Sequence, residues 1–188
     1  MANDSSTGGY LVPAASPAPL YDEPLRKFLQ QLVAGITGLA GQYVRPRWQP
    51  EPPNQPDRSV NWAAIGNIRE IQDGYATVMH NSSGDGSDEL QRHETLEVLA
   101  SFYGPAAGAY CAMLSDGLQI AQNREVLRAN AMNVLRTGDP VVVPELIKDL
   151  WVNRVDMMIS LRREVRRTYP VLNVLSAQVV VQVPDPVH

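Results

Sequence analysis

The sequence predicts an α+β fold: a mixed, mostly antiparallel β-sheet flanked by helices on one face. Three observations support this prediction. An apolar stripe at helical spacing follows residue 22, an alternating run covers residues 89–103, and the chain from residue 151 onward is again strand-like. The order helix, strands, helix, strands is typical of a sheet whose helices gather on one side.

Length and composition indicate a single domain preceded by a flexible end. The chain has 188 residues, of which 44% are hydrophobic and 19% are charged. Because globular proteins usually carry about 25% charged residues, part of this surface is predicted to be covered by other chains. Residues 1–20, rich in Ser, Gly, Ala and Pro, are expected to form a flexible N-terminal arm, and residues 21–188 the domain. Such an arm would either stay disordered or dock on a neighbouring subunit through Tyr10, Leu11 and Val12.

Charge and cysteine content exclude several classes of protein. The net charge of −4 argues against a protein that coats nucleic acid, which is usually basic. Cys111 is the single cysteine and there are three histidines, so neither an intramolecular disulfide nor a zinc cage is expected. A signal peptide and a membrane-spanning stretch are both missing, which predicts a protein made in a reducing cytoplasm.

The first predicted element is an amphipathic helix. Asp22 is the expected N-cap, and Glu23 and Pro24 suit the first turn. The apolar stripe consists of Leu25, Phe28, Leu29, Leu32, Val33 and Ile36. Gly35, Gly38 and Gly41 lower helix propensity and end the helix.

Residues 42–66 are predicted to form an ordered, extended loop, because five of the chain's 15 prolines lie there. We expect Trp48 and Trp62 to anchor this loop by packing beneath it, with Arg45 or Arg47 stacked on Trp48.

A β-hairpin is predicted next. The run 61–71 would pair with residues 75–80 across the Asp73-Gly74 turn. Residues 81–88 follow as a polar, glycine-containing loop. It lacks the spacing of an EF-hand, so we expect either a solvated tip or a contact with a neighbouring subunit through Ser83, Asp85 and Asp88.

The middle of the chain alternates between strand and helix signals. Residues 89–103 form the clearest strand, Gly104-Pro105 ends it, and a helix is expected over residues 106–122 with Cys111 as a buried thiol. A short helical turn, a strand over residues 131–135, a turn over 137–140 and one or two helical turns over 144–150 should follow.

The C-terminal part is predicted to be β-rich. In a strand over residues 151–167, one face would hold Trp151, Val155, Met157, Ile159 and Leu161. The arginines 162, 163, 166 and 167 would form a solvated strand face; alternatively, Arg162 and Arg166 would contact an acidic subunit edge. After a bend at Tyr169-Pro170, residues 171–183 would return as a strand.

The sequence contains none of the searched motifs for enzymatic chemistry. It has no phosphate-binding loop, no G-x-G-x-x-G after a strand and no G-x-S-x-G. His93-Glu94 lacks the second histidine of a metalloprotease helix. We therefore expect no catalytic residue, no cofactor and no bound metal.

Five segments together carry a resemblance to a known family. They read RPRWQP, NWAAIG, LEVLASFYGPAA, PELIKDLWVNRVD and RRTYPVLNVL, and a β-rich tail follows the last. Over roughly residues 22–183 the chain resembles the neck and tail terminator proteins of tailed bacteriophages. No catalytic residues exist in that family to be carried over.

The resemblance implies a structural virion protein, assembled in the host cytoplasm, that forms a ring similar to hexameric tail terminators. Such a ring would cap the tail tube, contact the tube or sheath protein and join the neck connector. DNA would pass through it without sequence-specific binding. The residues alone leave two alternatives open: a small cytoplasmic enzyme with a site assembled from scattered residues, and a head-closure connector subunit.

Overall fold

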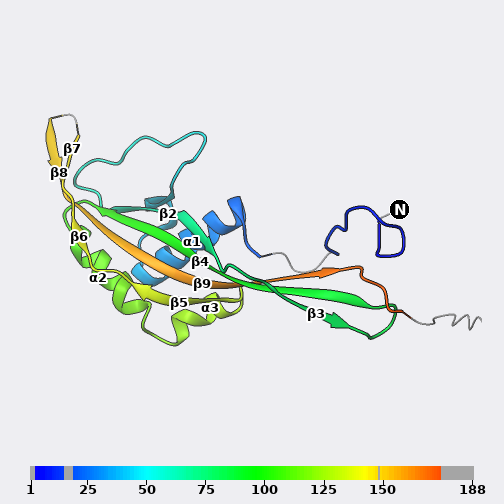
Figure 1. Cartoon of the computed structure of the whole chain (residues 1–188). Helices are drawn as coiled ribbons and strands as arrows, with labels where there is room; N and C mark the ends of the chain where they lie inside the picture. The colour runs from blue at the N-terminus through cyan, green and yellow to red at the C-terminus, as the bar shows by residue number, and fades with distance from the viewer. Residues whose placement is uncertain (1–2, 15–18, 148, 175–188) are drawn as a thin grey trace, which may run out of the picture.

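The computed structural model describes residues 3–14, 19–147 and 149–174, and these form helices packed on one side of a long, twisted sheet (Figure 1). The elements are α1 (Asp22–Thr37), η1 (Gly41–Tyr43), β1 (Val44–Pro46), β2 (Trp62–Gln72), β3 (Thr77–Asn81), β4 (Ser87–Tyr103), α2 (Ala107–Gly117), η2 (Gln122–Arg124), α3 (Glu125–Arg128), β5 (Met132–Thr137), β6 (Val141–Val142), β7 (Glu145–Ile147), β8 (Leu150–Val152) and β9 (Arg154–Tyr169).

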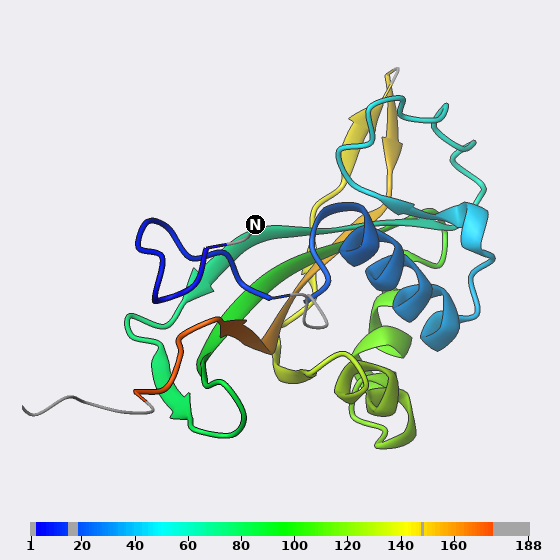
Figure 2. The same cartoon turned by 90° about the vertical axis from the view of Figure 1, so that its right-hand side faces the viewer.

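The main sheet has seven strands in the order β1-β2-β4-β9-β5, with β3 also paired to β4 and β6 to β9. Only the β1–β2 pair is parallel among these described pairs. The helices cover one face of the sheet, as Figure 2 shows. The predicted α+β class is thus confirmed. The strands β4 and β9 pair from Asp88–Tyr169 to Tyr103–Arg154 and form the centre of the sheet.

Helix α1 forms because its apolar residues recur at helical spacing and meet the sheet. Leu25, Leu29 and Val33 are buried, and Gly38 ends the helix in the left-handed conformation with φ 73°. A left-handed residue at this position suits glycine because it has no Cβ. The expected N-cap was wrong: Tyr21 occupies that position, and the Asp22 side chain makes no cap hydrogen bond.

The core lies between the helices and the inner face of β4 and β9. Leu96, Val98, Ala100 and Phe102 point into it from β4, as their alternation predicted. Helix α2 ends at Gly117, earlier than expected. A Cβ on Gly117 would lie 2.2 Å from the Ile36 side chain, so glycine permits the close approach of α1 and α2.

The predicted hairpin across Asp73-Gly74 was wrong. Strands β2 and β3 do not pair with each other; both pair with β4, which has 17 residues. The turn at residues 73–76 therefore joins two strands that run in the same direction along one edge of β4. A strand as long as β4 needs two partners on that edge to satisfy its backbone groups.

The expected helical turns over residues 144–150 were also wrong. Strands β7 and β8 pair there as a separate antiparallel hairpin. Trp151 is 68% exposed and its neighbour Val152 is buried, so the predicted apolar face of this strand starts at Val155 and not at Trp151. The alternation shifts at Asn153, which separates β8 from β9.

The proline-rich segment is an extended loop with a short strand, β1, at its start. Trp62 stacks on Tyr103, with ring centroids 4.0 Å apart and planes 4° apart. Arg45 lies over the Trp62 ring at 5.3 Å, and Arg154 lies over the Tyr103 ring at 5.6 Å. Trp62 is therefore the anchor. Packing of Trp48 beneath the loop was wrong, because Trp48 is 65% exposed. The stacking of an arginine on it was also wrong, because in the described residues the guanidinium groups that lie over rings are those over Trp62, Tyr103 and Tyr21.

The arginine cluster is not one solvated face. Arg163 is fully buried on the same side of β9 as Leu161 and Val165. Its Nε and Nη2 donate to Glu94 Oε1 at 3.0 and 2.7 Å, and its guanidinium lies 4.4 Å from the Tyr21 ring centroid. Its Nη1 donates to the Leu20 carbonyl oxygen. This pair ties β4, β9 and the start of α1 together.

The predicted return strand over residues 171–183 is described only as far as Val174, and residues 171–174 are irregular. The remainder of that prediction lies outside the described residues.

Replacing Arg163 by Met should lower the free energy of unfolding by about 3–5 kcal/mol, because the buried Glu94 then keeps only Arg92, at 3.9 Å from its Oε2, as a charged partner among the described residues. Arg167→Met is the matched control, since Arg167 lies four residues further along β9 on the same side and is only partly buried. Its effect should stay within about 1 kcal/mol. Urea unfolding of both variants measures the difference, and equal midpoints would contradict a structural role for the buried pair.

Trp62→Ala should cost about 3 kcal/mol, the lower end of the range for large aromatic residues, because Trp62 is only partly buried. Trp48→Ala should change stability by less than about 1 kcal/mol, since this side chain is mostly exposed. Thermal unfolding compares the two. A parent-like melting temperature for Trp62→Ala would show that the aromatic stack does not hold the loop.

Candidate functional site

A three-stranded β finger projects from the body of the molecule and is its most prominent surface feature (Figure 1). We define the finger as β3, residues 87–91 of β4 and residues 166–169 of β9, which pair with one another. All five residues of β3 are exposed. An extension with so little core of its own indicates a surface that is used for contact.

The residues that the sequence marked as contact candidates lie on or beside this finger. Ser83 and Asp85 belong to the tip loop between β3 and β4, and Asp88 and Arg166 lie on the paired strands. Arg162 lies at the root of the finger. Tyr10 and Leu11 belong to the N-terminal segment, which hydrogen-bonds to the end of β9.

The tip loop is held by Asn173, a residue that the sequence did not mark. Its side-chain Nδ2 donates to the carbonyl oxygens of Ser82 and Gly84 at 2.9 and 3.0 Å. Its backbone N–H donates to the Asp85 carbonyl oxygen at 2.8 Å. Gly86, with φ 97°, leaves room for it, because a Cβ there would lie 2.6 Å from the Asn173 nitrogen. The chain after β9 thus closes the tip.

His80 completes the tip by bridging two oxygen atoms. Its Nδ1 lies 2.7 Å from Asp88 Oδ1, and its Nε2 lies 2.8 Å from Asn173 Oδ1. Two such acceptors are both satisfied only when both ring nitrogens carry a proton. The hydrogen bonds to Asp88 and then to Asn173 accordingly raise the pKa of His80 above its usual 6.5.

Ion pairs link the strands along the finger and at its root. Arg166 pairs with Glu89 at 3.1 Å and also with Glu164. Arg162 donates to Thr95 Oγ1 at 3.1 Å and to the carboxylate of Asp73. The charges of Arg162 and Arg166 are therefore already paired within the chain. Each of these ion pairs contributes little to stability where solvent reaches it.

The N-terminal segment lies beside the end of β9. The N–H of Ser5 donates to the Pro170 carbonyl oxygen at 3.1 Å, and that of Ala14 donates to the Thr168 carbonyl oxygen at 2.7 Å. Tyr10 is 93% exposed, whereas Leu11 is partly buried. These contacts position the segment at the finger rather than at the body.

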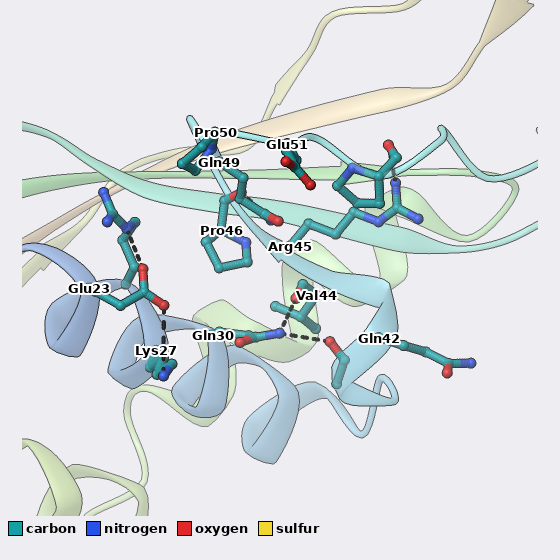
Figure 3. A pocket seen from close by; sticks show the side chains of 13 residues that line it. Glu23, Lys27, Gln30, Gln42, Val44, Arg45, Pro46, Gln49, Pro50 and Glu51 are labelled. Carbon is teal, nitrogen blue, oxygen red and sulfur yellow. Dashed lines mark hydrogen bonds and ion pairs between the residues drawn. The ribbon is translucent and has the colours of Figure 1, made fainter.

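A cleft of about 530 Å³ lies between α1 and the proline-rich loop (Figure 3). Several of its polar groups already have partners: Gln30 donates to the carbonyl oxygens of Gly41 and Val44, and Glu23 pairs with Arg26 and Lys27. Figure 3 shows the Gln30 contacts as links from the helix to the chain that leads into the loop, whereas the Glu23 pairs lie within α1. The arrangement fixes the loop to α1.

Other residues considered for chemistry also have structural roles. Cys111 is fully buried, as predicted, and burial raises the pKa of its thiol to about 11, so the thiol is protonated near neutral pH. Within the described ranges no three His, Cys, Asp or Glu side chains are grouped as metal ligands. No helix in the same ranges is long and apolar enough to cross a membrane.

The tip gives a pH-dependent prediction. Since the pKa of His80 is raised on folding, its stabilisation of the tip is complete below about pH 6.5 and is lost as pH rises through the raised value. Amide exchange in the tip loop should therefore accelerate beyond the intrinsic rate increase as the pH rises above about 6.5 and through the raised pKa of His80. Asp88→Asn should lower the pKa of His80, measured by NMR titration, and reduce this extra acceleration. His93→Gln, which removes a histidine outside the tip, is the control; an unchanged His80 titration in Asp88→Asn would contradict the bridge.

Comparison with known proteins identifies the family. A protein-family model described as "Phage neck terminator protein" matches residues 23–185, which is most of the chain. No match was found among curated proteins. The matched family is structural, not enzymatic, so the small-enzyme alternative is set aside. With the family model spanning the helices, the sheet and the finger, the chain belongs to the phage neck terminator proteins, structural components of the virion.

Proposed function

We propose that this neck terminator forms a closed ring of six chains that caps the tail tube and joins it to the head–neck connector. The observation that carries the proposal is a body that matches the terminator family and whose sheet edges, within the described residues, have exposed apolar side chains and no further strand paired to them. Leu135 and Val142 are exposed beside one edge, and Ile71 and Val78 are exposed along the other. Uncovered edges of this kind favour association, and ring closure covers them symmetrically.

The finger is the proposed contact element, with Ser83, Asp85 and Asp88 at or beside its tip, Arg166 on one of its strands and Arg162 at its root. Tyr10 and Leu11 add to it from the N-terminal segment, and we keep residues 1–20 as the proposed arm and 21–188 as the proposed domain. Exposed Tyr75, Val78 and Met79 on and before β3 support a contact with a neighbouring subunit or an adjacent ring. The already ordered tip supports docking without a large ordering cost.

The proposed partners are further copies of this chain, the tail tube or sheath protein and the neck connector. The net charge of −4 supports a ring that lets DNA pass without gripping it, since proteins that hold the DNA backbone are usually basic. No cofactor takes part in this function.

Imaging of assembled phage particles tests the ring. We expect a closed ring of six subunits at the neck, with about 1,600 Å² or more buried at each subunit interface. Density for residues 82–86 should lie against another subunit or ring. Particles are the proper sample because the free protein need not assemble without its partners. Subunits placed there without closing into a ring would end the proposal. A fully solvated tip would show that the finger is not a contact element, and would leave the ring itself untouched.

A further inference from the structure

Strand β3 borders the finger, and its outer side is open (Figure 1). Among the described residues it pairs only with β4, in an unbroken register from Thr77–Gln91 to Asn81–Ser87. No other described segment forms a backbone hydrogen bond with β3 on its outer side. An edge of this kind offers a row of N–H and C=O groups to any extended chain that approaches it.

The other edges of the main sheet, in the part of the chain that the structure describes, each have a feature that hinders strand pairing. Strand β1 has three residues and ends at Pro46, β2 and β5 each have a break in register, and the two residues of β6 lie between Pro140 and Pro144. The end of β9 lies beside the N-terminal segment, whose Ala14 N–H donates to the Thr168 carbonyl oxygen.

Strand β3 has none of these features. Its sequence, TVMHN, contains no proline and no Lys, Arg, Asp or Glu, and its register with β4 has no bulge. Proteins usually protect exposed strand edges from pairing with other chains. An edge without such protection is the form in which an added strand is accepted, because main-chain hydrogen bonds then supply the affinity.

The hydrogen-bond pattern of β4 shows which residues of β3 face outward. The N–H of Asp73 donates to the carbonyl oxygen of His93, so the odd-numbered residues of β4 direct their backbone groups toward β2 and β3. Their partners, the odd-numbered residues in 77–81, therefore bond inward. Val78 and His80 direct their N–H and C=O groups to the open side.

A second copy of β3 fits this edge when the two strands run antiparallel about Met79. Val78 of each copy then lies opposite His80 of the other, and their outward groups form four backbone hydrogen bonds. Met79 lies opposite its own copy, and Thr77 lies opposite Asn81. No like charges face each other in this register, and Val78 and Met79, which are 58% and 48% exposed, lose solvent contact.

The projection of the finger leaves room for this approach. Strand β3 runs from the root of the finger to its tip, so antiparallel pairing points two fingers in opposite directions and keeps the two bodies at opposite ends (Figure 1). The strongly exposed Tyr75 at the root then lies beside the tip loop of the other copy. Asp73, the charged residue nearest to it at the root, already pairs with Arg162.

We propose that two copies of the free protein pair through their β3 edges and form a two-fold dimer with a six-stranded sheet across both fingers. This contact is isologous, whereas the subunit contacts of a closed ring are heterologous. The dimer is therefore distinct from the proposed ring, and it must separate before the β3 side of the finger contacts anything in a particle. Because two five-residue edges bury little area, the dimer is weak and depends on concentration.

A single cysteine substitution at the two-fold axis tests the register. Met79→Cys places the two thiols opposite each other in a non-hydrogen-bonded pair, whose Cα atoms are about 4.5 Å apart and within reach of a disulfide. Mild oxidation of the purified full chain should give a covalent dimer. Thr77→Cys is the matched control on the same face: its two copies are about 13 Å apart along the strands and should stay uncoupled. Cys111 is buried and does not contribute.

The backbone contribution is measured separately by analytical ultracentrifugation. Val78→Pro removes an outward N–H and no bond to β4, so the chain should keep its melting temperature, since proline is tolerated at such edge positions. Its dimer dissociation constant should rise at least about tenfold, which corresponds to about 1.4 kcal/mol. Gln72→Pro is the control: Gln72 pairs with the even-numbered Glu94 and also faces outward, but it lies on β2, and its dissociation constant should not change.

The outcomes separate this contact from other arrangements. A chain that stays monomeric at its highest soluble concentration would overturn the dimer and leave β3 as an edge for a different protein. Equal cross-linking of Met79→Cys and Thr77→Cys, or an unchanged dissociation constant in a folded Val78→Pro, would place the contact elsewhere and overturn it as well. All these measurements use the free protein, so the proposed ring, which is tested in particles, does not depend on them.

Discussion

The buried ion pair between Arg163 and Glu94 is the constraint on which the shape of the molecule depends. It lies where the seven-stranded sheet narrows to the three strands of the finger, and the two residues are direct cross-strand partners on β9 and β4. Two charges removed from water require close geometry and further hydrogen bonds. The Tyr21 ring and the Leu20 carbonyl oxygen supply these from the segment that leads into α1. Helix, body and finger are thereby fixed relative to one another at a single point.

Polar contacts on the opposite side of the sheet reinforce this junction. Arg162 reaches Asp73 and Thr95, and the N–H of Asp73 donates to the His93 carbonyl oxygen at 3.0 Å. Asp73 lies in the turn where the partner of β4 changes from β2 to β3. The turn that the sequence predicted at Asp73-Gly74 thus places β2 and β3 end to end along β4. A finger built on a continuous β4 and β9 is held at its root on both faces.

How much of this was readable from the sequence varies by element. Helix α1 and strand β4 followed directly from their periodicity, because each packs one face on a continuous core. The burial of Arg163 also had a signal, since it stands in step with Leu161 and Val165, but a run of arginines suggested a solvated face. The pairing of β2 and β3 with β4 had no signal in the sequence. Asp73-Gly74 signals a turn, but which strands pair across it depends on the length of β4, which lies further along the chain. The β7–β8 hairpin was missed because its three-residue strands are too short to show a period.

The contact residues show a related contrast. The tip was recognisable from its glycines and acidic residues, whereas Asn173 was not, because it joins the tip only through the fold. Charges on the finger are largely satisfied within the chain, as the pairs of Arg166 with Glu89 and His80 with Asp88 illustrate. Pairs already formed lose less on burial than isolated charges do. The low share of charged residues and their internal pairing therefore leave exposed apolar side chains, rather than long-range charge, as the support for the subunit contacts that we propose. A ring that assembled as we propose would gain its binding free energy chiefly at close range, after its subunits have been brought into register.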